Sequence, residues 1–290
     1  MDGSRLSRDG WNPGRAGRGS ALIAVVALAC VALGGCGHPQ PYVSPARLDR
    51  GLVVVLPGIE GRSPFNEGIC EGLDDGGVDW AIELYDWTSP WIGPLVNLRM
   101  EDRNREQARK LADRITRYHM SYPGRPVVLV GQSGGGAIAI WTAEALPPGE
   151  SIKGAVLLAA AISPGYMLDA ALNNTREGIA SFYSERDWLM LGFGTVTNGT
   201  MDREFVSSAG RVGFERPATP MRSQHYLKLY EIPWNPSMSF AGHGGGHHTS
   251  GARQFVATYV TPLVLAQTWD DQLIRGLKAP LPVSPPAPQE

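Results

Sequence analysis

Residues 126–145 read PVVLVGQSGGGAIAIWTAEA, and this stretch decides which fold the chain adopts. It opens with PVVLV, an apolar run typical of a strand buried on both faces, and closes with small and apolar residues that predict a tightly packed helix. Between them Ser133 stands in a G-x-S-x-G turn, with Gly131 and Gly135 two residues to either side. Glycines at these positions let strand and helix nearly touch, and the strained turn pushes the serine hydroxyl above the sheet. A Gly-rich turn that binds a phosphate or merely packs is the alternative interpretation.

The rest of the chain alternates between predicted strands and helices on both sides of this turn. The further predicted strands are 52–56, 80–85, 152–159, 178–183 and 226–232, and the further predicted helices are 103–118 and 252–265. Such alternation predicts an α/β fold, with a mainly parallel sheet of about six strands flanked by helices. In such sheets the functional residues follow the carboxyl ends of the strands.

Composition narrows the possible classes of function. The chain has 290 residues, and 43% of them are hydrophobic, which is enough for a sizeable core. Its formal net charge is -2, so the sequence indicates no general affinity for nucleic acid. Of its three cysteines, Cys30 and Cys36 lie in or beside an N-terminal apolar run, which leaves Cys70 alone in the body of the chain. No disulfide framework is therefore available, and Cys70 is expected to be a small buried apolar residue.

The N-terminal segment has the order of an export signal. Four arginines precede an apolar run at residues 21–35. The run is shorter and richer in Ala and Gly than a typical transmembrane helix. The run ends in LGGC at residues 33–36, which resembles the bacterial lipobox. The resemblance implies that Cys36 carries a lipid, that residues 1–35 are removed, and that the protein is exported to the bacterial cell envelope and anchored to a membrane. An uncleaved signal anchor, or a plain signal peptide with an incidental cysteine, is the alternative.

Four segments follow from these patterns. We expect a signal peptide at 1–35, a tether at 36–50, a folded domain at 51–278 and a disordered Pro-rich tail at 279–290.

With the G-x-S-x-G turn between a strand and a helix, the chain resembles the α/β-hydrolase fold over about residues 51–266. The resemblance implies that Ser133 is the nucleophile and that an acid and then a histidine follow it along the chain. The acid is expected just after strand 178–183, where Asp187 is the first choice and Glu185 the second. Its role would be to orient the imidazole and stabilise its cation.

The histidine is expected in the Gly-rich segment that follows strand 226–232. His247 is the first choice because it directly precedes the last predicted helix, with His248 second and His243 third. It would take the proton from Ser133 and return it to the leaving group. A metal site built from the three histidines is the competing hypothesis.

Acyl transfer also requires donors for the tetrahedral oxyanion. The resemblance assigns one to the backbone N–H of Gly134 and the other to the loop at residues 57–61, where Ile59 is the expected donor. This loop departs from the His-Gly-Gly-Gly form of many lipases and esterases, which argues against a close tie to those enzymes.

Four tryptophans follow strand ends and are candidates for an aromatic substrate pocket: Trp87, Trp91, Trp188 and Trp234. The connection between strands 152–159 and 178–183 is short, so no large cap domain is expected there. The longer stretch 189–224 could still fold partly over the pocket.

Together these features predict a serine hydrolase that cleaves small or polymeric carboxylic esters through an acyl-enzyme, with no cofactor and no metal. The alternatives are an envelope amidase, peptidase or acyltransferase with the same triad, or a non-catalytic binding lipoprotein.

Overall fold

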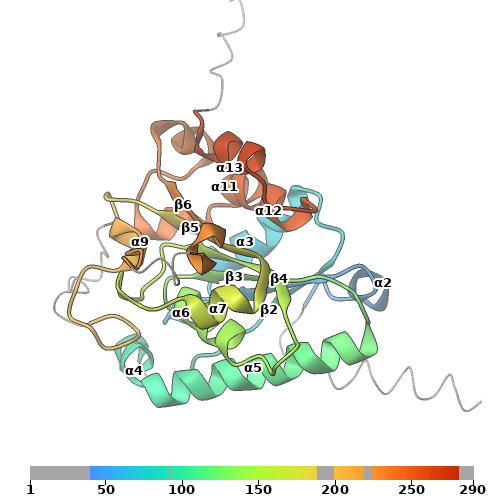
Figure 1. Cartoon of the computed structure of the whole chain (residues 1–290). Coiled ribbons are helices and arrows are strands. Elements are labelled where there is room, and N and C mark those ends of the chain that lie inside the picture. The colour runs from blue at the N-terminus through green and yellow to red at the C-terminus, as the bar shows by residue number, and fades with distance from the viewer. Residues whose placement is uncertain (1–39, 90, 92, 188–198, 219–223, 281–290) are drawn as a thin grey trace, which may run out of the picture. The chain divides into compact units, whose positions relative to one another are not determined.

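The computed structural model describes residues 40–89, 91, 93–187, 199–218 and 224–280 (Figure 1). These residues belong to one folded unit that starts at Gln40. The predictions for residues 1–35, Cys36, Trp188 and most of the Pro-rich tail lie outside the described residues.

A six-stranded sheet forms the centre of this unit, with its strands in the order β2-β1-β3-β4-β5-β6. Every neighbouring pair is parallel, so the carboxyl ends of all six strands lie at one edge of the sheet. The strands are β1 Leu52–Leu56, β2 Ala81–Leu84, β3 Val127–Gln132, β4 Ile152–Leu158, β5 Thr175–Tyr183 and β6 Leu229–Pro233. The predicted fold class is confirmed, including the short β4–β5 connection, whose only helix is α7 (Asp169–Asn173).

Helices cover both faces of the sheet (Figure 1). The long helix α5 packs on α6, which packs on β3, whereas α3 and the C-terminal helices cover the other face. The longer helices are α3 Pro64–Asp75, α4 Pro94–Arg99, α5 Glu101–Ser121, α6 Gly134–Glu144 and α13 Asp271–Lys278. Helix α5 buries a stripe of apolar residues that recur at helical spacing: Ala108, Leu111, Ala112, Ile115 and Tyr118.

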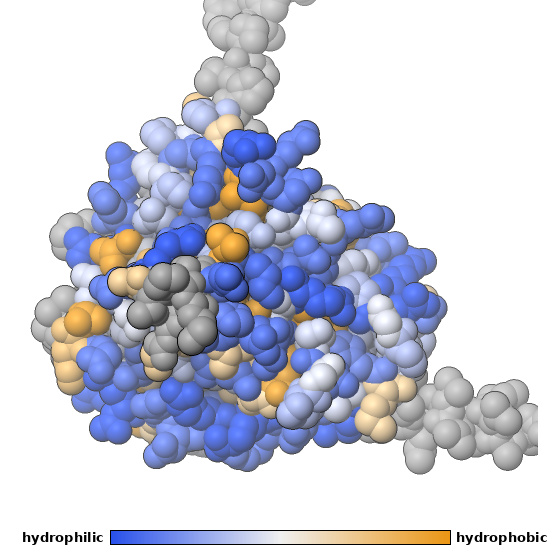
Figure 2. Space-filling model, in the orientation of Figure 1, coloured by the Kyte–Doolittle hydropathy of each residue, from blue (hydrophilic) through white to orange (hydrophobic). Residues whose placement is uncertain are grey.

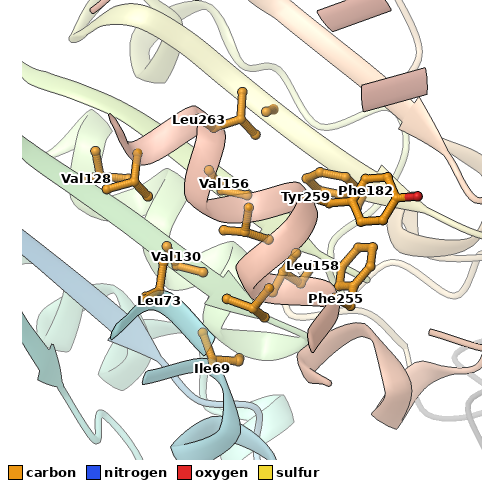
Figure 3. Packing of buried hydrophobic residues seen from close by; sticks show 14 of the residues in the cluster. Ile69, Leu73, Val128, Val130, Val156, Leu158, Phe182, Phe255, Tyr259 and Leu263 are labelled. Carbon is orange, nitrogen blue, oxygen red and sulfur yellow. The ribbon is translucent and has the colours of Figure 1, made fainter. Parts of the chain in front are cut away.

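The core between the sheet and the C-terminal helices is built from alternate strand residues (Figure 3). Val128 and Val130 of β3 point to the same face, since successive strand side chains alternate between faces. They meet Ile69 and Leu73 from α3, while Phe255 packs edge-on against Phe182 of β5. This packing fixes the last helical segment, and with it the loop that precedes it.

The last helical segment is interrupted, although the sequence predicts a single helix at 252–265. The segment consists of α11 Arg253–Phe255, a π-helical turn η4 Val256–Val260 and α12 Thr261–Leu265. Pro262 lies in the first turn of α12 and has no N–H to donate into the preceding turn, which accounts for the break there.

Residues 40–50 pack against the domain, although the sequence predicts a tether there. They contain the short helix α2 (Pro45–Leu48), and Arg47 forms an ion pair with Asp74 of α3 at 2.6 Å. Leu48 is buried, and its carbonyl accepts a hydrogen bond from the Tyr118 hydroxyl at 2.7 Å. The tether prediction therefore fails for this part of the segment, because Leu48 and Arg47 find partners that are distant in sequence.

The surface of the domain is mainly hydrophilic on the face shown in Figure 2, with apolar residues gathered in a few places. Among the helices that the structure describes, none combines the length and the hydropathy needed to cross a membrane.

Candidate active site

Ser133 occupies a strained turn between β3 and α6. Its φ of 53° and ψ of -121° lie in a region that residues other than glycine rarely adopt. A side chain at Gly131 would collide with the backbone of Gly135, and one at Gly135 would collide with the carbonyl oxygens of Leu56 and Pro57. The two glycines of the G-x-S-x-G motif are therefore required by backbone contact, as the sequence predicts.

Potential oxyanion donors lie next to this turn. A Cβ at Gly134 would be only 2.9 Å from Cγ2 of Ile59, so the loop after β1 and the first residue of α6 are in contact. Within the described part of the chain, neither the Ile59 nor the Gly134 amide donates a hydrogen bond. Both remain available to an oxygen atom held above Ser133.

Asp187 and His247 form a buried, hydrogen-bonded pair. The Nδ1 of His247 lies 2.9 Å and 3.1 Å from the two carboxylate oxygens of Asp187, 60 residues away in sequence. Both side chains are almost fully buried, so the carboxylate takes its stabilisation from this partner rather than from water. Asp187 therefore engages Nδ1 of the imidazole and not its second nitrogen, Nε2.

The alternative residues lie elsewhere or have other partners. Glu185 and His248 are exposed, and His248 stacks on Phe65 with ring centroids 4.8 Å apart. His243 is buried, and its Nδ1 lies 3.0 Å from the Thr249 hydroxyl. In the part of the chain described, no cluster of three or more His, Cys, Asp or Glu residues could hold a metal ion.

Ser133 lies at the same sheet edge as the Asp187–His247 pair, because β3, β5 and β6 are parallel. The segment His247–Gly251 (η3) packs on α3, which follows the Ile59 loop. Among the described residues, neither the Ser133 hydroxyl nor Nε2 of His247 has a hydrogen-bond partner. Catalytic hydrogen bonds in unliganded sites often tighten only when substrate binds.

Trp234 braces the two loops that carry the pair. Its indole N–H donates to the carbonyl of His243 at 2.7 Å, and the Arg186 guanidinium lies 4.3 Å above its ring. Trp234 thus joins the turn before Asp187 to the loop before His247. The sequence offers it as a pocket residue, and gives no signal of this bracing contact.

The other tryptophans differ in their exposure. Trp87 is buried; its ring borders Gly134, and its indole N–H donates to the carbonyl of Pro57 at 2.7 Å. It therefore supports the loop that carries Ile59. Trp91 has 92% of its surface exposed.

Two further contacts near the Ser133 turn have no signal in the sequence. Met201, inside the stretch expected to cover the pocket, is buried with its sulfur beside Gly134. Asp202 holds this segment down by accepting hydrogen bonds from the backbone N–H and the hydroxyl of Ser163. An Asp and a Ser 39 residues apart give no local pattern, so only the tertiary structure reveals the clamp.

A cavity of about 1010 Å³ opens beyond the end of β4. Ser163 and Asp202 line it, whereas Ser133, Asp187 and His247 do not. Its lining contains five carboxylates and one guanidinium: Glu144, Asp169, Asp202, Glu204, Glu215 and Arg105. This charge balance favours neutral or cationic groups over anionic ones.

Burial of His243 predicts a measurable effect of pH on stability. Burial lowers the pKa of His243 to about 4 from a usual 6.5, so the folded protein keeps this imidazole neutral where the unfolded chain protonates it. Stability from this group is present above pH 6.5 and is lost as the pH falls toward 4, by an amount on the order of 3 kcal/mol. The free energy of unfolding, measured with urea at pH 7 and at pH 4.5, should therefore fall less between these pH values for His243→Gln than for the wild type. Equal losses would contradict this assignment.

The parallel sheet, the strained serine after its third strand and the acid–histidine pair after its last two strands together define the α/β-hydrolase fold. Among solved structures the chain is similar to Aspergillus fumigatus lipase B, with a TM-score of 0.49 and 12% identity over 85% of this chain. It spans 61% of that lipase's length. It is also similar to Est1E from Butyrivibrio proteoclasticus, with a TM-score of 0.45 and 13% identity over 76% of this chain and 88% of that one. No protein-family model matches the chain, and no curated protein matches it.

Proposed function

We propose that the protein is a serine hydrolase that cleaves carboxylic esters through an acyl-enzyme on Ser133. The observation that carries the proposal is the strained Ser133 turn at the sheet edge that also bears the buried Asp187–His247 pair. Neither part alone would suffice, because Gly-rich turns also serve packing and buried ion pairs also serve stability.

In this mechanism His247 Nε2 takes the proton of the Ser133 hydroxyl as the oxygen attacks the ester carbonyl. Asp187 accepts a hydrogen bond from the Nδ1–H group of His247, which fixes the tautomer and stabilises the imidazolium that forms. The amides of Gly134 and Ile59 donate to the developing oxyanion. His247 then protonates the departing alcohol, and water attacks the acyl-enzyme by the reverse series of proton transfers.

The carboxylate-lined cavity after β4 contains none of Ser133, Asp187 and His247, so its charge does not distinguish an ester from an amide. Amide, peptide and acyl-transfer reactions use the same residues, so the reaction type needs a direct test.

The test is fluorophosphonate labelling of the full chain, combined with turnover of p-nitrophenyl acetate, butyrate and octanoate. We expect one label, located on the peptide containing Ser133, and hydrolysis of at least one ester. Labelling without ester turnover would move the assignment to amide hydrolysis or acyl transfer. A folded protein with neither signal would refute the serine-hydrolase mechanism.

The two neighbouring histidines provide a matched pair of variants. We expect His247→Ala to lower kcat/KM by about 10³-fold or more, because this imidazole is the proposed acceptor of the serine proton, and His248→Ala to change it by less than about threefold. The assay is hydrolysis of the best p-nitrophenyl ester. Asp187→Asn and Glu185→Gln form the corresponding pair for the acid. A large loss on changing His248 or Glu185 would overturn the assignment.

A further inference from the structure

The first described residues of the chain are fixed to the edge of the sheet. The side-chain amide of Gln40 pairs with the backbone of Leu84, donating to its carbonyl at 3.0 Å and accepting from its N–H at 3.1 Å. The N–H of Ile82 donates to the carbonyl of Tyr42 at 3.2 Å. Leu84 is the last residue of the edge strand β2, so Gln40 is held at the carboxyl edge of the sheet, where Ser133 also lies.

Very little chain separates this fixed point from the expected membrane attachment. Only Gly37, His38 and Pro39 lie between Cys36 and Gln40. Fully extended, this link spans at most about 14 Å, whereas a domain of this length is about 45 Å across. A lipid on Cys36 and an uncleaved anchor at residues 21–35 would both attach the chain to the membrane just before Gln40. Either attachment keeps the Gln40 side of the domain against the membrane.

An exposed apolar surface lies on this same side. Strand β2 leads from Leu84 into α4, whose inner residues Asn97 and Leu98 are buried. Apolar side chains are exposed on α4 and on either side of it: the exposed fractions are 40% for Leu95 and 45% for Val96 in the helix, 92% for Trp91 before it and 39% for Met100 after it. We call these four residues the α4 apolar surface. All four lie within ten residues of chain, and exposed apolar residues close together mark an interaction site more often than scattered ones do.

The α4 apolar surface is also coupled to the candidate active site. The buried side chain of Asn97 donates to the carbonyl of Ile59 at 3.1 Å and accepts from the N–H of Ser89 at 3.2 Å. The inner side of α4 therefore holds the loop that offers the oxyanion donor, and its outer side faces away from the domain. A lipid surface in contact with α4 would border the entrance to Ser133.

We propose that the α4 apolar surface inserts into the membrane to which the N-terminus is attached, and that Ser133 draws amphiphilic acyl esters from that bilayer. The docking part of the proposal rests on the Gln40 tie and the short link. The substrate part rests on the proposed ester hydrolase. Burial of apolar side chains at the boundary between headgroups and acyl chains drives the insertion.

The experiment uses the full chain, exported and processed in a bacterial host and reconstituted into phosphatidylcholine vesicles that contain nitroxide-labelled lipid. A fluorescent NBD label is placed on Val96→Cys, and, as the matched control, on Met120→Cys. Met120 is also apolar, with an exposed fraction of 76%, but it lies near the end of α5, which leads to the opposite edge of the sheet. Cys70 is buried and free, and the wild-type chain taken through the same labelling reaction gives the background from Cys30 and Cys36.

We expect lipid nitroxides to quench the label at position 96 at least about threefold more than the label at position 120. Equal quenching at the two positions would overturn the docking surface. Shielding of position 96 from water without quenching by the nitroxide lipid would also overturn it, since a protein partner or a second copy would then cover α4.

A second measurement separates docking from chemistry. The double variant Leu95→Gln/Val96→Gln should hydrolyse an ester embedded in the vesicles at least about tenfold more slowly, while its turnover of soluble p-nitrophenyl acetate and its fluorophosphonate labelling stay unchanged. If the wild type takes no label, the ester-hydrolase proposal fails, and the quenching result still decides the docking surface. Equal rates on the embedded ester for variant and wild type would refute the claim that substrate comes from the bilayer.

Discussion

Replacing Ser133 by alanine is expected to lower kcat/KM for a soluble p-nitrophenyl ester by about 10⁴-fold or more. The hydroxyl is the atom that forms the acyl-enzyme, and a methyl group cannot replace it. The backbone donors of Ile59 and Gly134 would remain, so a small residual rate above the uncatalysed reaction should persist. Steady-state kinetics with the full chain measure the loss.

The variant must remain folded for this result to have meaning. The positive φ at Ser133 strains the backbone of alanine as much as that of serine, so the substitution adds no strain. Circular dichroism should show an unchanged fold, and urea unfolding should show a change in the free energy of unfolding of less than about 1 kcal/mol. Ser121→Ala, an exposed serine at the end of α5, serves as the control and should keep full activity. Retention of more than a tenth of the activity by the Ser133 variant would exclude this serine as the nucleophile.

Replacing Gly135 by alanine is expected to destabilise the fold by about 3 kcal/mol or more. The new methyl group would collide with the carbonyl oxygens of Leu56 and Pro57. These are backbone atoms at the end of the buried strand β1, so no side chain can rotate away to make room. Either β1 or α6 has to shift, and both hold the serine turn. Urea unfolding gives the change in the free energy of unfolding, and activity should fall with it.

Gly276→Ala is the matched control. Gly276 occupies an exposed position of helix α13, where a Cβ would meet nothing within 4 Å. Alanine in an exposed helix is expected to stabilise by about 0.5–1 kcal/mol relative to glycine. The same substitution should therefore have opposite signs at the two sites. A Gly135 variant as stable as the wild type would show that the contact between β1 and α6 is looser than described.

The amino-acid sequence determined the sheet and the serine turn. Unbroken apolar runs marked β1 and most of β3, because a strand buried on both faces needs no polar side. Polar residues concealed the start of β5, where Arg176 is exposed and Glu177 is partly exposed. Short local patterns can report burial and turn geometry, since both depend on neighbouring residues.

Tertiary structure alone decided which distant groups meet. The sequence ranked His247 above His248, but only the fold brings its Nδ1 to Asp187 across 60 residues. Only the fold shows that Trp234 contacts two loops and that the side chain of Gln40 is hydrogen-bonded to the last residue of β2. The physical reason is that such contacts depend on how loops from separate strands pack together at one sheet edge, and this packing leaves no periodic signature in any single segment.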